Sequence, residues 1–392
     1  MQFNYVCSQC GKNYAVDPHL MVCPRCTRQQ VADQPLAGIL EVALKGQAAP
    51  DFDIHELLPV ERRYFPPIPV GNTPLWRPQR LRKSLDFTAL YIKDDGANPT
   101  SSFKDRASFL VSAMAKKFGI DQIVLASTGN AGSSMAGVGA AAGQTVTLFL
   151  PKDAPPAKLI QALQYGATVH RVDGSYDMAY DLSMAYARRK QAMSRNTAHN
   201  PMTIEGKKSV SLELYHQLDG TAPDYLFVST GDGCILSGVY KGFRDLKQVG
   251  LITRMPVVFS VQAKGSDALY RAFQNGRFEK RPTQTIADSI CVAVPRNGLH
   301  ALAQLKRFGG EVVTVSDERI IAAQALLSSS TGLFTEPAGA AAFAGFLKVK
   351  AGLAEDATIV ILATGNGLKD SPAASKGIRI PEGTIRSIEE IR

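Results

Sequence analysis

One lysine stands where a free amine would be chemically useful. Lys104 lies in the run NPTSSFKDR (98–106), which precedes an apolar pattern of helical spacing over 103–119. Asn, Pro, Thr and Ser are typical of a helix N-terminus, so Lys104 is expected in the first turn. There the helix dipole and burial disfavour an ammonium group, which lowers its pKa and favours a nucleophilic amine. An exposed lysine at a helix start remains the alternative.

Three glycine-rich turns each follow an apolar run that is typical of a buried strand. They are STGNAG (127–132), STGDGC (229–234) and ATGNG (363–367). Ligands of parallel α/β sheets bind at the carboxyl ends of strands, where such a turn offers backbone N–H groups to an anion. None of the turns matches a P-loop, and none has the glycine pattern and following acid of a nicotinamide site.

Four cysteines form a C-x2-C pair, a twelve-residue spacer and a second C-x2-C pair. They are Cys7, Cys10, Cys23 and Cys26. No secretion signal is recognisable, so this spacing predicts a structural zinc ribbon rather than disulfides, with its metal supplying most of its folding energy. A ribbon that takes iron, or one that has lost its metal, is the alternative.

Composition limits the classes of function. The 392 residues carry 44 Lys and Arg against 35 Asp and Glu, a net charge of +9, and 45% of them are hydrophobic. These values exclude wholesale disorder, and no apolar run is long enough to span a membrane. The basic residues are scattered, so they indicate no nucleic-acid partner. We expect a soluble cytoplasmic protein that binds a small molecule.

Alternating strand and helix patterns position these residues. Residues 31 to about 85 are rich in proline and are expected to be irregular. Helices are expected over 103–119, up to Gly143, and around 156–165 and 176–189. Buried strands are expected at 90–95, 122–127, 145–151, 168–172, 224–230, 256–263 and 358–365. Such alternation predicts an α/β fold in which helices cover parallel sheets.

Several motifs together resemble one enzyme family. NPTSSFKDR is similar to the signature around the cofactor lysine of threonine synthase, a fold-type II (tryptophan-synthase-type) pyridoxal-phosphate enzyme. Further similar segments, between about residues 70 and 372, are GNTPL (71–75), STGNAG (127–132), GLFTEPAGAAA (332–342) and TGNGLKD (364–370). The resemblance implies two open parallel-sheet domains with the cofactor in the cleft, plus the N-terminal zinc ribbon. We expect the ribbon at 1–30, a linker and the start of the large domain at 31–100, the small cofactor-cleft domain at 101–200 and the large cofactor-phosphate domain at 201–392.

The resemblance also assigns roles to individual residues. Lys104 corresponds to the lysine that carries pyridoxal 5'-phosphate and later acts as acid and base, and Phe103 is expected beside the ring. Asn130 would hydrogen-bond the phenolic oxygen and Thr364 would face the pyridine nitrogen. The phosphate of the cofactor would be bound by Gly231, Asp232, Gly233, Cys234 and Ile235. The substrate carboxylate would be bound by Ser127, Thr128, Gly129 and Ala131.

Two segments depart from the family pattern. The cofactor-phosphate loop is GDGCI instead of GNAGN, which puts the Asp232 carboxylate beside a dianion. In the segment that holds the substrate phosphate in threonine synthases, Asn, Ser and Arg are replaced by Thr197, Ala198 and Thr203. A guanidinium is not easily replaced at a phosphate site. Lys207 stands where the family has Gln, so it and Thr203 are our candidates for substrate binding, and a substrate without phosphate remains possible.

The resulting expectation is a homodimeric lyase of amino-acid biosynthesis that converts O-phosphohomoserine and water to threonine and phosphate. The alternative is a paralogue that catalyses β-elimination, like serine/threonine dehydratases, or β-replacement, like cysteate or cysteine synthases. A third hypothesis, a non-catalytic zinc-ribbon protein that binds nucleic acid, lacks the basic and aromatic stripe it would need. His199 and His300 could serve as acid/base groups, although a lone histidine is usually structural.

Overall fold

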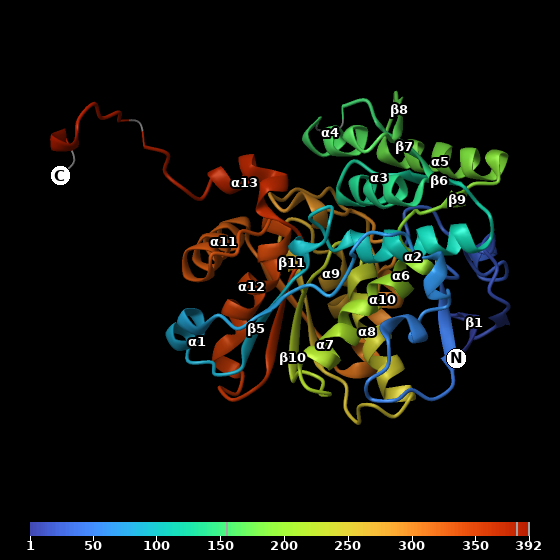
Figure 1. Cartoon of the computed structure of the whole chain (residues 1–392), viewed down its shortest axis with the longest axis horizontal. Helices are drawn as coiled ribbons and strands as arrows, with labels where there is room; N and C mark the ends of the chain where they lie inside the picture. Colours follow the sequence, from blue (N-terminus) through green and yellow to red (C-terminus); the bar gives the residue numbers. More distant parts are fainter. Residues whose placement is uncertain (154–155, 382, 391–392) are drawn as a thin grey trace.

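The computed structural model describes residues 1–153, 156–381 and 383–390 (Figure 1). It contains two sheets covered by helices and a smaller antiparallel sheet at the N-terminus. The α/β fold that the sequence predicts is therefore confirmed. The expected division of the chain into domains stays a prediction.

The larger sheet has six strands in the order β12-β11-β10-β13-β5-β4, and all its pairings are parallel except that of β4 with β5. Its strands are β4 (Leu75–Trp76), β5 (Leu90–Asp94), β10 (Tyr225–Ser229), β11 (Val257–Ala263), β12 (Glu311–Val315) and β13 (Ile359–Ala363). These strands are apolar on both faces because helices cover both of them.

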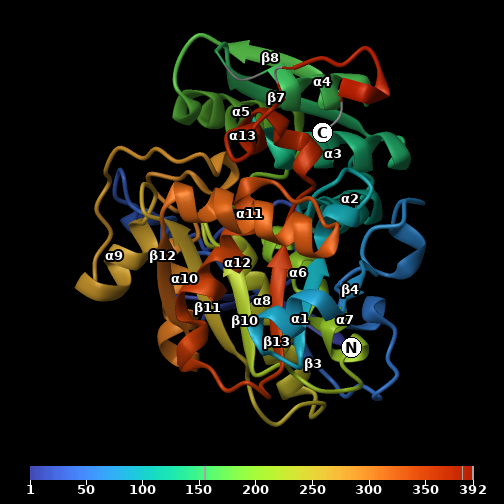
Figure 2. The same ribbon diagram turned by 90° about the vertical axis from the view of Figure 1, so that its left-hand side faces the viewer.

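Side-chain alternation in β10 shows how the two faces are covered. Leu226 and Val228 join one apolar core with α7 (Ser209–Gln217), α8 (Cys234–Gln248) and α10 (Gly298–Phe308). Phe227 points the other way, as the pleat requires. It joins a second core with the helices that cover the face seen in Figure 2, namely α1 (Gln79–Leu85), α11 (Asp317–Thr331) and α12 (Pro337–Val349).

The smaller sheet is parallel and has the order β8-β7-β6-β9. Its strands are β6 (Gln122–Ala126), β7 (Thr145–Pro151), β8 (Thr168–Val172) and β9 (Met193–Ser194). Ile123 and Leu125 of β6 pack in one core with α2 (Lys104–Lys117) and α3 (Asn130–Ala142), whereas Val124 packs with α5 (Tyr176–Lys190). The remaining helices are α4 (Pro156–Gln164), α6 (Met202–Lys207), α9 (Ala268–Asn275) and α13 (Ser371–Ser375).

The N-terminal sheet has the order β2-β1-β3, and β1 (Gln2–Cys7) lies in its middle. It pairs with β2 (Asn13–Tyr14) on one side and with all six residues of β3 (Leu40–Lys45) on the other. The expectation of irregular chain over 31–85 was therefore wrong in part, since this segment holds β3, β4 and α1. The apolar pattern of each of these elements is short and lies in a proline-rich segment, so it is hard to recognise in the sequence.

All seven buried strands that the sequence predicts are present, within one or two residues of the expected ends. Besides β3 and β4, the prediction omitted β1, β2, β9 and β12. No helix in the described ranges combines the length and the hydrophobicity that a membrane span needs.

Candidate active site

Lys104 begins α2, as predicted, and its side chain is half-buried. Its backbone N–H donates to Oγ of Ser102 at 3.2 Å, and within the described chain its amine has no hydrogen-bond or ion-pair partner. Burial lowers the pKa of Lys104 to about 8, and the like charge of Lys207 adds to this effect. Asp232 and Glu336 act in the opposite direction. The amine is therefore available near neutral pH.

The loop before α2 is held against the end of β13. Phe103 N donates to the carbonyl of Thr364 at 2.9 Å, and Ser102 forms a β-bridge with Gly365. Phe103 is fully buried and Thr364 nearly so. These bonds bring the predicted lysine and the predicted ring-facing threonine to one edge of the large sheet, the edge formed by the carboxyl ends of its parallel strands.

The asparagine loop lies between β6 and α3 and closes on itself. Oγ of Ser127 accepts the N–H of Gly129 at 3.2 Å and that of Gly132 at 3.0 Å. The other predicted carboxylate-binding residues, Thr128 and Ala131, are half-buried. The loop therefore presents its backbone at the carboxyl edge of the small sheet, where sequence analysis expects the substrate carboxylate.

Asn130 is buried at the start of α3, and only one of its two polar side-chain atoms has a hydrogen-bond partner among the described residues. Its Nδ2 donates to both carboxylate oxygens of Glu336, at 2.9 and 3.1 Å. Its Oδ1 is buried without a hydrogen bond in the described residues. A buried polar atom left unpaired is costly, so Asn130 is prepared for a partner that the described residues do not supply. Glu336 is the contact that sequence reasoning did not anticipate.

The predicted cofactor-phosphate loop connects β10 to α8. Gly233 has φ +86°, and a Cβ there would lie 2.7 Å from Cβ of Ala301, so only glycine fits. Asn297 holds the loop by donating its N–H to the carbonyl of Asp232 and its Nδ2 to that of Gly233, each at 3.0 Å. The carboxylate of Asp232 accepts the N–H of Cys234, the first residue of α8, at 2.9 Å. This carboxylate is therefore already hydrogen-bonded to the N-terminus of α8. Gly231 and Ile235 flank these residues in the same turn.

The two predicted substrate-binding residues of α6 are fully buried. Oγ1 of Thr203 donates to the carbonyl of Asn200 at 2.7 Å and accepts the N–H of Ala198 at 3.2 Å, so this hydroxyl stabilises its own loop. Nζ of Lys207 donates to Sγ of Cys234 at 3.0 Å. Lys207 therefore lies against the first residue of α8.

Arg195, directly after β9, is the functional candidate that the sequence analysis missed. Its guanidinium is completely buried. Nη1 donates to Oγ1 of Thr197 at 2.8 Å, Nε donates to Oγ of Ser108 at 3.3 Å, and Nη2 has no partner among the described residues. Burial lowers the pKa of Arg195 to about 10, against the opposing charges of Cys234 and Asp232. No spacing rule marks such a residue, because its burial depends on the pairing of β9 with β6.

The two histidines that the sequence offers as acid/base groups have different surroundings. Burial lowers the pKa of His199 to about 4, with a further contribution from Arg296, so His199 is neutral at physiological pH. His300 is buried and contacts Oγ of Ser237 at 2.9 Å and Oε1 of Glu41 at 2.9 Å. It joins β3 to α8 and α10.

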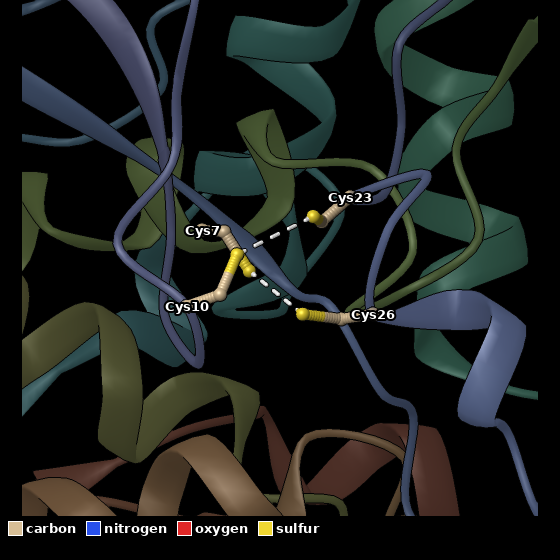
Figure 3. Close-up of side chains that lie close together, drawn as sticks. All are labelled: Cys7, Cys10, Cys23 and Cys26. Carbon is tan, nitrogen blue, oxygen red and sulfur yellow. Dashed lines mark hydrogen bonds between the residues drawn. The ribbon is translucent and has the colours of Figure 1, made fainter.

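The four N-terminal cysteines converge as predicted (Figure 3). Their sulfur atoms all lie within 4.8 Å of one another. Sγ of Cys7 lies 3.7 Å from that of Cys26, and Sγ of Cys10 lies 3.8 Å from that of Cys23. All four are free thiols. This is the donor set and the spacing of a tetrahedral four-thiolate site.

Comparisons with known proteins give concordant results. A family model described as pyridoxal-phosphate dependent enzyme matches residues 68–365. The threonine synthase of Methanocaldococcus jannaschii is 34% identical over 396 residues, covering 96% of this chain and 95% of that protein. The threonine synthase of Methanosarcina acetivorans is 32% identical over 400 residues, covering 100% of this chain and 98% of that protein.

Two solved structures extend the comparison to three dimensions. A maize serine racemase superposes with a TM-score of 0.68 at 21% identity, covering 78% of this chain and 91% of that one. Threonine deaminase isoform 2 of Solanum lycopersicum also has a TM-score of 0.68, at 20% identity, covering 91% and 94%. At these identities the similarity establishes a common fold and no more.

Proposed function

The chain belongs to the pyridoxal-phosphate dependent enzymes, and from this premise we propose that it is a threonine synthase-like lyase that converts O-phosphohomoserine and water to threonine and phosphate. The observation that carries this proposal is similarity to threonine synthases over nearly the whole chain, ribbon included. The surroundings of Lys104 also support it, because burial and the like charge of Lys207 lower the pKa of that amine to about 8.

The residues of the site fit pyridoxal 5'-phosphate. An unpartnered amine suits the aldehyde, the unpaired Oδ1 of Asn130 suits a ring hydroxyl, and the glycine turn at the head of α8 suits a phosphate. When bound, this cofactor supplies an electron-withdrawing ring that stabilises negative charge on the substrate carbons. Thr364 offers the pyridine nitrogen a neutral hydroxyl, which suits elimination and replacement chemistry rather than transamination.

The remaining roles follow from position. Lys104 holds the cofactor and then moves protons at the substrate carbons, for which a pKa near the operating pH is favourable. Phe103 is buried directly beside Lys104 in the chain, and the backbone of Ser127 to Ala131 would bind the substrate carboxylate. Lys207 and Thr203 lie against Cys234 at the start of α8, where Lys207 would supply positive charge to the substrate.

A paralogue that catalyses β-elimination or β-replacement is the second candidate. The observation that favours it is the hydrogen bonding of Thr203. Its hydroxyl donates to the carbonyl of Asn200 and accepts the N–H of Ala198, so it offers little to a phosphate. Such an enzyme would use the same lysine and the same carboxylate loop on an amino acid with a different leaving group.

A substrate panel separates these functions. Purified holoenzyme should release phosphate and threonine from O-phosphohomoserine with kcat/KM of about 10⁴ M⁻¹s⁻¹ or more. Borohydride should fix the cofactor on the peptide that contains Lys104, and Lys104→Ala should abolish both the visible absorbance and turnover. Ammonia and a 2-keto acid from serine or threonine, without phosphate release, would instead establish the eliminase. Labelling of another lysine would contradict the assignment of Lys104.

We also propose that Cys7, Cys10, Cys23 and Cys26 bind one structural zinc ion. Elemental analysis of protein purified without chelator should find one zinc per chain. Cys23→Ser should lower the thermal midpoint and leave the cofactor absorbance unchanged, whereas Cys291→Ser should affect neither. Protein without metal, or with iron in its place, would reject the proposal. The homodimer, the cytoplasmic location and a role in amino-acid biosynthesis stay predictions.

A further inference from the structure

Two buried cations have no carboxylate counter-ion among the residues that the structure describes. Among residues whose side chains the structure describes, six lysines and arginines are almost completely buried: Lys93, Arg106, Arg195, Lys207, Lys208 and Lys241. Four of them form ion pairs with buried carboxylates. Arg195 and Lys207 form none within the described residues. Burying a charge without a partner is costly, so the pair calls for a negative ligand.

Both cations are related to the start of α8. Lys207 contacts Sγ of Cys234, the first residue of α8. The charge of Asp232 acts on Arg195, which puts the guanidinium within electrostatic reach of the same helix start. Lys104 is affected by both cations. The three positive groups are therefore close enough to influence one another electrostatically.

Nη2 of Arg195, which has no partner among the described residues, lies on the side of the site that faces the small sheet. Arg195 follows β9, and its N–H donates to the carbonyl of Val124 in β6. The next residue, Asn196, holds the N–H of Ala126 just before the carboxylate-binding loop. The cofactor phosphate, in contrast, is assigned to the turn between β10 and α8. The position of Arg195 thus favours an anion that arrives with the substrate.

We propose that Arg195, assisted by Lys207, binds an oxyanion of the substrate, a phosphate or another group of similar size, beside the amine of Lys104. The inference rests on the proposed function, because it takes the substrate to lie between the small-sheet loops and α8. In this arrangement Arg195 supplies the guanidinium that position 203 lacks. It makes a substrate with a distal oxyanion the preferred class over serine or threonine.

Inorganic phosphate is the probe for this site. Titrated into holoenzyme, it should raise the unfolding temperature in a saturable manner. Arg195→Met should weaken phosphate binding about tenfold to a hundredfold, the range for charge-assisted hydrogen bonds, with the cofactor still retained on dialysis. Without phosphate, Arg195→Met should unfold at the same or a higher temperature than wild type, because a buried unpaired charge has been removed.

Two further variants make the result decisive. Arg195→Lys keeps the charge and should bind phosphate with intermediate affinity, and it gives the answer if the methionine variant does not fold. Arg189→Met removes an exposed charge from α5 and should change nothing. Unchanged phosphate binding in both Arg195 variants, or loss of cofactor in place of phosphate, would overturn the inference. Arg195-dependent phosphate binding by a holoenzyme that is inactive on O-phosphohomoserine would uphold it and reject the proposed substrate.

Discussion

Lys104 shares its surroundings with charges of both signs. Lys207 and Arg195 disfavour its protonated form, and Asp232 and Glu336 favour it, while burial decides the direction. A pKa of about 8 means that roughly a tenth of the amine is unprotonated at pH 7. The reactivity of this lysine is therefore adjusted by neighbours that the sequence places up to 232 residues away.

Cofactor uptake should report this balance. The rate at which apoenzyme takes up pyridoxal phosphate should rise with pH and level off above about pH 8, as free amine forms. Lys207→Gln removes a like charge, so the midpoint should move upward by about half a pH unit, equivalent to ~0.7 kcal/mol. Visible absorbance measures the rate. Lys116→Gln, an exposed change on the same helix, should leave the midpoint in place, and a downward shift in Lys207→Gln would contradict the argument.

At the scale of single residues, the sequence allowed a role to be predicted where that role depends on neighbouring residues in the chain. The surroundings of Lys104 and the turns that hold Asn130 and Gly233 depend on short motifs, so each could be named from a few neighbouring residues. Arg195 and Glu336 could not be assigned in this way. Their importance comes from contacts across the site, such as that between Asn130 and Glu336, 206 residues apart.

At the scale of elements, a buried ion cluster fixes α2 against the large sheet. Arg106 of α2 contacts Asp95 after β5 at 2.5 Å and Glu213 of α7 at 2.6 Å, and Lys93 of β5 also contacts Glu213, at 2.7 Å. Burial opposes ionisation of Glu213, but Arg106 and Lys93 outweigh it and lower its pKa to about 2. Since Lys104 lies two residues before Arg106, this cluster sets where the amine stands.

Acid should weaken this cluster. A carboxyl group with a lowered pKa stabilises the fold fully above its unfolded pKa, near 4.5, and loses that contribution as the pH falls towards 2. Arg106→Met leaves two buried carboxylates without their main partner and should cost about 3–5 kcal/mol at pH 7. Urea unfolding at pH 7 and pH 3 measures both effects. The deficit of the variant should shrink at pH 3, and an equal deficit at both values would disprove the electrostatic account.

The elements themselves were predictable to different degrees. β6, β10 and β13 are apolar on both faces, a pattern with few alternatives, and they lie where expected. β3 was missed because its partner β1 lies about 35 residues earlier, and only the pairing makes its six residues a strand. β9 has two residues, too few for any periodicity.

At the scale of the whole molecule, the N-terminal sheet is joined to the catalytic part by one charged contact group. Glu41 of β3 accepts from Nη1 of Arg244 in α8 at 2.9 Å and contacts Nε2 of His300 in α10 at the same distance. His300 in turn contacts Ser237, which Asn297 also contacts at 2.5 Å. The N-terminal sheet and the loop predicted to bind the cofactor phosphate thus share a hydrogen-bond network.

Breaking this junction should loosen the ribbon first. Glu41→Gln leaves Arg244 without its carboxylate and should cost about 3 kcal/mol, since removing one partner of a buried pair is strongly destabilising. Limited proteolysis should cut within residues 1–45 faster in this variant, before the rest of the chain is cleaved. Glu56→Gln, an exposed change of the same type, should match wild type. Equal cleavage of both variants would mean that the Glu41 contacts do not hold the N-terminal sheet in place.

The central place of β1 in its sheet has a practical consequence for shortened versions of the protein. Removing the first seven residues would take away the middle strand and expose the six backbone positions of β3 that pair with it. An unpaired strand edge of this length is a template for intermolecular pairing. Loss of the N-terminal strand would then show itself first as aggregation, even in molecules whose lysine and cofactor loops are intact.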